Sequence, residues 1–160
     1  MTDHTENLLW QFSLAYYQQP KAAKCLLLLQ DEYGAQVNIL LWCLWQGVDG
    51  CLISAEDLER ALALIDKHQN NYLLPTRELR RALKNHPFDT VYKQAKSLEL
   101  ELERWEQQTL FELKISSGRG PDAAQQNLLM YGEHLMHQEE PGQSYSSGLN
   151  SQLEQLLKYL

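Results

Sequence analysis

The chain has 160 residues, of which 44% are apolar, and its 14 Lys and Arg against 21 Asp and Glu give a formal net charge of −7. This length fits one domain, and the apolar fraction suffices for a packed core, which excludes wholesale disorder. The acidic balance argues against a general nucleic-acid-binding protein, so we expect no nucleic-acid partner.

The start of the chain and its cysteines predict the compartment. Residues 1–6 are acidic overall, unlike the basic and then apolar start of a secretory signal. The longest apolar stretch, Val37–Trp45, is far shorter than the roughly 20 residues that cross a bilayer. Cys25, Cys43 and Cys51 form no CxxC pair, which is typical of reduced thiols. We therefore expect a cytoplasmic protein that makes no membrane contact.

Helical spacing of apolar residues begins at the N-terminus, and no stretch alternates between apolar and polar residues as a strand does. Leu9, Phe12 and Tyr16 share one face of a first helix that stops before Pro20. Pro20 begins the second helix, because proline is favoured in a first turn. Gly34 ends it, because glycine readily adopts the left-handed conformation at a helix C-terminus.

The segment Val37–Trp45 is apolar on nearly all sides, which places a helix at the centre of a core. Asn38 interrupts it and must be hydrogen-bonded if buried; we expect a backbone group of the preceding turn as its partner. Ser54 then begins a helix with a capping box completed by Asp57. Pro75 either kinks that helix or begins a new one.

The longest helix is predicted over residues 89–115. Its apolar residues recur at intervals of three and four, namely Val91, Ala95, Leu98, Leu102 and Trp105. A turn at 116–120 separates it from a further helix that Pro121 begins. Together these elements predict an all-α fold over residues 1–137, a single-domain bundle of about six or seven helices around the central helix at Val37–Trp45.

The C-terminal region divides into two parts. Residues 138–148 are rich in Glu, Pro, Gly, Gln and Ser and have no apolar stripe, which predicts a flexible tether. Residues 149–160 form a short amphipathic helix with five leucines. Because a helix of about 11 residues is only marginally stable alone in water, it needs a surface. That surface is either the chain's own core or a partner.

Motifs for catalysis and cofactor binding are missing. The sequence has no glycine-rich phosphate loop, no GxSxG motif, and no serine or cysteine recognisably paired with a histidine. Glu133, His134 and His137 share a predicted helix but lack the further ligands that a helical metal site needs. We therefore expect no catalytic residue, metal ion or cofactor, and a non-enzymatic protein is favoured.

One charged feature distinguishes the chain. Residues 77–84 carry a net charge of +3, whereas residues 1–76 and 85–160 each carry −5. The basic residues lie at i, i+3, i+4 and i+7, so they form one stripe on a helix: Arg77, Arg80, Arg81 and Lys84. Clustered guanidinium groups suit a phosphate or a carboxylate, which makes this basic stripe a candidate anion- or partner-binding site.

The alternative is that the basic stripe binds no ligand or partner. It is either a solvated face or a set of ion pairs with acidic residues of the following helix, for which the chain offers Glu99, Glu101, Glu103 and Glu106.

Several segments resemble a family of short, uncharacterised proteobacterial proteins. They are Leu9–Leu14, Tyr16–Tyr17, Cys25–Gln30, Gly34, Val37–Trp45 and Pro75–Lys84. The similarity covers about the first two thirds of the chain. It implies a bacterial, all-helical protein with a domain of unknown function, and it assigns no activity, cofactor or site residue.

Two functions follow from these patterns. The leading hypothesis is a non-enzymatic protein-interaction or regulatory module, because the chain combines a basic stripe with a tethered leucine-rich helix and has no catalytic motif. The alternative is a small-ligand-binding protein or enzyme with an anion-binding helical pocket. In that case tryptophans would line the pocket, and the arginines would hold the anionic group of the ligand.

Overall fold

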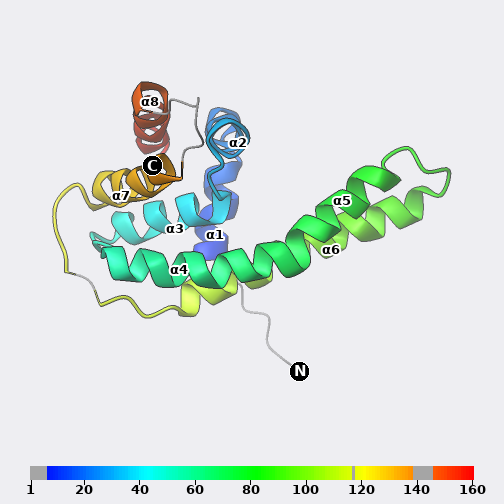
Figure 1. Ribbon diagram of the computed structural model, residues 1–160, viewed down its shortest axis with the longest axis horizontal. Coiled ribbons are helices and arrows are strands. Elements are labelled where there is room, and N and C mark those ends of the chain that lie inside the picture. The colour runs from blue at the N-terminus through cyan, green and yellow to red at the C-terminus, as the bar shows by residue number, and fades with distance from the viewer. Residues whose placement is uncertain (1–6, 117, 139–145) are drawn as a thin grey trace.

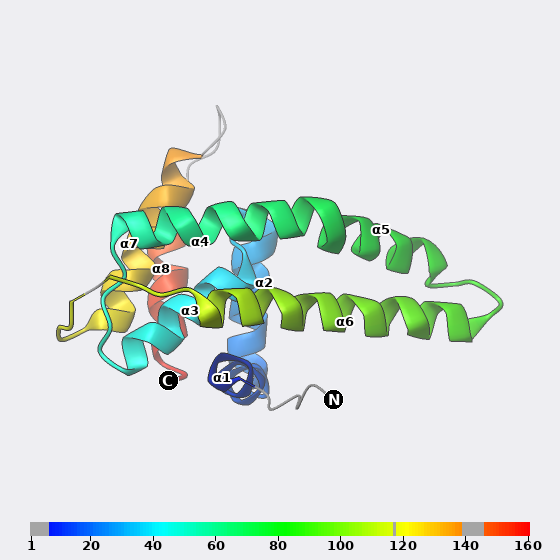
Figure 2. The same ribbon diagram turned by 90° about the horizontal axis from the view of Figure 1, so that it is seen from below.

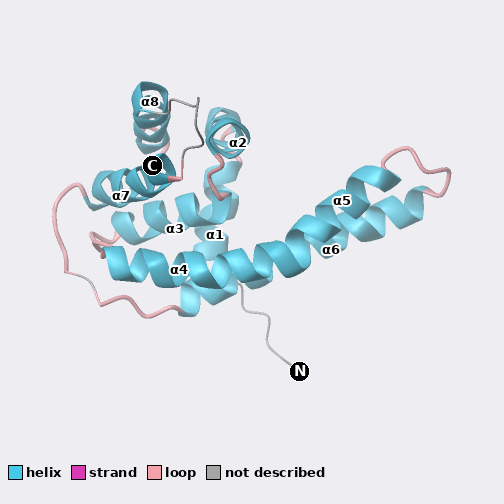
Figure 3. Ribbon diagram, viewed as in Figure 1, coloured by secondary structure: helices cyan, strands magenta, loops and turns pink. Residues whose placement is uncertain are grey.

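A computed structural model describes residues 7–116, 118–138 and 146–160. Its elements are α1 (Leu8–Tyr17), α2 (Pro20–Tyr33), α3 (Val37–Val48), α4 (Ala55–His68), the π-helix η1 (Gln69–Leu73), α5 (Leu74–Leu83), α6 (Asp89–Glu112), α7 (Ala123–His137) and α8 (Ser146–Leu157). Since α4, η1 and α5 follow one another without a gap, these ranges hold seven separate helical segments, and no strand among them (Figure 3). The predicted all-α bundle is confirmed.

Local signals in the sequence set several helix ends as expected. Pro20 lies in the first turn of α2, and Gly34 ends that helix with a φ of 69°. The capping box of α4 is complete: Asp57 N donates to Ser54 Oγ at 3.0 Å, and Ser54 N donates to Asp57 Oδ2 at 3.3 Å.

Pro75 lies in the first turn of α5, as the second of the two alternatives predicted, and α5 follows η1 without a gap. Its nitrogen has no hydrogen to donate to a carbonyl in the preceding turn, and the turn before it is the π-helix η1. The wider turn lets the chain pass continuously from α4 into α5, so the two helices form one rod.

The predicted central helix is α3, in which the residues from Ile39 to Leu44 are all buried. Its most extensive contact is with α7. A Cβ atom built on Gly47 would lie only 2.2 Å from Ala124 Cα. The backbones of α3 and α7 therefore approach so closely that position 47 has no room for a side chain.

The C-terminal helix packs on the chain's own core. Leu149, Leu153 and Leu156 of α8 are fully buried, and α8 contacts α2 and α7. Tyr16 Oη donates a hydrogen bond of 2.7 Å to the Leu156 carbonyl. Helix α8 begins at Ser146, before the expected position 149. Of the tether predicted over 138–148, residues 139–145 lie outside the described ranges.

A two-helix projection extends from this body. Figures 1 and 2 show α5 and the first half of α6 running side by side away from the other helices; we call residues 74–98 the helical arm. Leu79, Phe88 and Leu98 of the arm are at least half exposed. The apolar stripe predicted for the long helix is thus only partly buried: Val91 and Leu98 are exposed on the arm, and Trp105, in the body half of α6, is 51% exposed.

Candidate ligand pocket at the base of the helical arm

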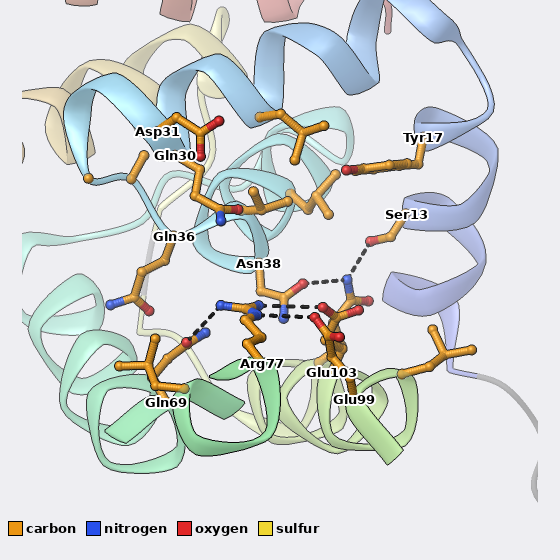
Figure 4. A pocket seen from close by; sticks show the side chains of 18 of the residues that line it. Ser13, Tyr17, Gln30, Asp31, Gln36, Asn38, Gln69, Arg77, Glu99 and Glu103 are labelled. Carbon is orange, nitrogen blue, oxygen red and sulfur yellow. Dashed lines mark hydrogen bonds and ion pairs between the residues drawn. The ribbon is translucent and has the colours of Figure 1, made fainter. Parts of the chain in front are cut away.

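A pocket of about 750 Å³ lies where the helical arm meets the body (Figure 4). Side chains of α1, of the end of α2 and of the start of α3 line one side of it, and α4, η1, α5 and α6 line the other. Its apolar walls include Leu14, Leu27, Leu41, Leu74 and Leu100. Its polar lining includes three residues of the basic stripe, namely Arg77, Arg80 and Arg81.

Two arginines of the basic stripe form ion pairs with the neighbouring helix. Arg77 Nε lies 3.3 Å from Glu99 Oε1, and its Nη2 lies 3.4 Å from Glu103 Oε1. Arg80 Nε pairs with the other oxygen of Glu99. The internal pairing considered for the stripe is therefore observed for Arg77 and Arg80, with two of the four glutamates considered.

The other two basic residues of the stripe, Arg81 and Lys84, do not take part in these ion pairs. Arg81 and Lys84 are exposed, and within the described ranges neither has a carboxylate at ion-pair distance. Arg81 lines the pocket, whereas Lys84 lies beyond it near the end of the arm. The four residues thus share one stripe, but the structure brings only three of them to the pocket.

Glu106 does not line the pocket, but its carboxylate bonds two residues that do, Asn38 and Gln69. Its carboxylate is fully buried and accepts hydrogen bonds from Asn38 Nδ2 at 2.9 Å and from Gln69 Nε2 at 3.1 Å. His68 Nδ1 lies 3.0 Å from its second oxygen. A buried carboxylate is expensive without partners, and here side chains from α3, α4 and η1 supply them.

Gln107 extends this network toward α1. Its Nε2 donates to Ser13 Oγ and to Asn38 Oδ1, each at 2.9 Å (Figure 4). Gln107 is 1% exposed and lines the pocket. Its Oε1 accepts no hydrogen bond from any described group. The expectation that Asn38 bonds a backbone group was wrong, because its amide joins two side chains of α6.

Burial also acts on the charged part of the lining. Desolvation raises the pKa of Glu103, and the nearby carboxylates of Glu99 and Glu106 raise it further, while Arg77 opposes the shift. The carboxylates of Glu99, Glu103 and Glu106 therefore lie close enough to repel one another. Arg77 offsets this repulsion because it pairs with both Glu99 and Glu103.

Sequence reasoning missed most of this network. Ser13, Gln69 and Gln107 look like ordinary surface residues in the sequence. Only Asn38, inside an apolar segment, indicated a buried polar contact. A helical pattern shows which residues share a face, but it does not show which helix faces them. Among the described residues, no group of three side chains is suited to hold a metal ion.

Comparison with known proteins gives one match. A family model described as a protein of unknown function (DUF2390) matches residues 8–110, which include every residue that lines the pocket. No curated protein and no solved structure matches the chain. Within the described ranges, no helix has the length and apolarity needed to cross a membrane.

Proposed function

We propose that this chain, which belongs to the DUF2390 family, is a small-molecule-binding protein whose site is the pocket at the base of the arm. The supporting observation is a cavity of about 750 Å³ with apolar walls and a buried polar network at one end. Small-ligand sites typically measure about 300–1,000 Å³ and combine apolar walls with a few fixed polar groups.

The polar network supports a binding role because it is unfavourable for folding alone. A buried amide oxygen without a partner costs about 1–3 kcal/mol, and Gln107 Oε1 is such an atom. Glu106 and Gln107 occupy positions at the core end of α6 where leucine would pack without this cost. A bound ligand with hydrogen-bond donors would satisfy the free oxygen.

A pocket-blocking substitution tests the proposal. Leu100 lines the pocket and is 48% exposed, so Leu100→Trp places a larger side chain in the pocket and narrows the space for a ligand without disturbing the core. We expect this variant to keep its fold and to lose at least tenfold in affinity for compounds that bind the wild type. Thermal-shift screening against a metabolite library finds the compounds, and calorimetry measures their affinities.

Leu98→Trp is the matched control. Leu98 is 50% exposed, lies on the same helix and is not part of the pocket lining, so this variant should bind like the wild type. The proposal is wrong if no compound raises the melting temperature of the wild type, or if every compound that does so also binds Leu100→Trp equally.

The helical arm favours a second candidate, a protein-interaction module. Residues 77–98 contain six Lys and Arg but two Asp and Glu, in a chain whose net charge is −7. Leu79, Phe88 and Leu98 add exposed apolar surface. This combination suits an acidic protein surface with apolar side chains.

Charge reversal at the exposed end of the basic stripe tests this second function. Arg81→Glu with Lys84→Glu changes two exposed residues that have no carboxylate partner among the described residues. We expect the double variant to lose a partner that co-purifies with the wild type. Lys21→Glu with Lys24→Glu, two exposed positions on α2, should retain it. If the wild type retains no protein, the second candidate fails.

A further inference from the structure

We propose that the pocket takes a small organic cation, an aliphatic amine or guanidine, rather than an anion; this inference rests on the proposed function. The charged side chains that line the pocket are three arginines and four carboxylates. The pocket that the sequence suggested for an anion therefore contains more negative than positive groups.

The ion pairs inside the pocket do not remove the excess of negative charge. Arg77 and Arg80 are engaged by Glu99 and Glu103. Of the remaining lining carboxylates, Asp66 accepts one hydrogen bond, of 2.7 Å from Gln36 Nε2. Asp31 is exposed and has no ion-pair partner within the described ranges. The lining charges outside these ion pairs are therefore two negative groups, Asp31 and Asp66, and one positive group, Arg81. Two carboxylates with spare acceptor positions favour a cationic ligand.

The buried network supplies a second, independent reason. The carboxylate of Glu106 can only accept hydrogen bonds, so it fixes the NH₂ group of Asn38 as its donor. The Asn38 oxygen must then accept from Gln107 Nε2, which leaves Gln107 Oε1 as a buried acceptor without a donor. A turned Gln107 amide would set its oxygen against the Asn38 oxygen and lose the bond between them, so this orientation follows from the chemistry of Glu106.

A second amide oxygen in the pocket also lacks a hydrogen-bond donor among the described groups. Gln36 lines the pocket, and its Oε1 is also buried without a partner, while its Nε2 bonds Asp66. Both free oxygens require N–H or O–H donors. An ammonium or guanidinium group supplies such donors, whereas a phosphate dianion or a carboxylate does not.

The rest of the lining fits the body of such a ligand. Leu14, Leu27 and Leu100 provide apolar surface for an aliphatic chain. Tyr17 lines the pocket with a side chain that is 40% exposed, and an accessible aromatic ring attracts organic cations. Arg81 lies at the arm end of the lining and would disfavour a second positive charge there.

Calorimetry with defined probes tests the inference. We use butylguanidine and pentylamine, each with a single positive charge, as cations, and succinate and inorganic phosphate as anions, at about 0.15 M salt so that the general attraction of an acidic protein for cations is screened. We expect the cations to bind the wild type and the anions not to bind. Asp31→Asn and Asp66→Asn should each weaken cation binding about tenfold, because each removes one charged hydrogen-bond partner.

Glu32→Gln is the matched control for Asp31→Asn. Glu32 is the next residue on α2, is exposed and does not line the pocket. Cation binding that Glu32→Gln preserves and Asp31→Asn weakens supports the inference. Cation binding that both variants weaken equally is non-specific and overturns it.

Two further outcomes separate this inference from the proposed function. If succinate or phosphate binds instead of the cations and Leu100→Trp prevents that binding, the ligand class is wrong and the pocket function stands. If neither class binds and the library also yields no compound sensitive to Leu100→Trp, both fail.

Discussion

Gly47→Ala is expected to destabilise the protein by about 3 kcal/mol or more, although alanine is the better helix former by about 1 kcal/mol. The added methyl group would lie 2.2 Å from Ala124 Cα and 2.4 Å from Ala124 N. Both are backbone atoms, so no side-chain rotation relieves the overlap and α3 must move away from α7. That movement loosens the most extensive helix contact of the core.

Chemical denaturation and thermal melting measure this effect. For a domain of this size, about 3 kcal/mol corresponds to a fall of roughly 6–12 °C in melting temperature. Gly118→Ala is the control, because a Cβ there meets nothing within 4 Å. An unchanged melting temperature for Gly47→Ala would show that α3 and α7 do not pack as closely as described.

Glu106→Gln is the second large effect, with an expected loss of about 2–4 kcal/mol. The carboxylate accepts from Asn38, Gln69 and His68. A glutamine amide replaces one accepting oxygen by an NH₂ group, which then faces a donor. The surrounding amides would have to turn to avoid this contact, and turning Asn38 breaks its bond from Gln107. We therefore also expect weaker ligand binding in this variant.

Glu112→Gln makes the same chemical change on the same helix. Glu112 is exposed and accepts a hydrogen bond from Gln108 Nε2 at 2.7 Å, so its substitution should change stability by less than about 0.5 kcal/mol. If Glu106→Gln is equally mild in urea denaturation, the charge of Glu106 does not organise the polar network.

Local chemistry explains what the sequence predicted well. The ends of α2 at Pro20 and Gly34 and the start of α4 at Ser54 depend on the residue itself and its near neighbours. The burial of α3 follows from a segment with almost no polar residue to face solvent. In each case, the cause lies within a few residues of the chain.

Features that depend on distant residues could not be predicted. The sequence pattern placed Leu98 and Trp105 on the apolar face of the long helix, yet both are about half exposed. The adjacent Glu106 and Gln107 are buried instead. Which face of α6 is covered depends on where the body ends and on the polar side chains that α1 and α3 present. No periodicity within α6 contains that information.

The π-helix η1 makes the site depend on chain length as well as on residue type. One extra residue in a helical turn rotates everything after it by about 100° relative to an uninterrupted α-helix. Arg77 and Arg80 come after η1, and in this rotational phase they meet Glu99 on α6. Deletion of one residue within 69–73 would keep every arginine and glutamate and still turn the arginines to another side of the rod. In homologous chains, a gap at this position would therefore mark a different pocket even where the charged residues are identical.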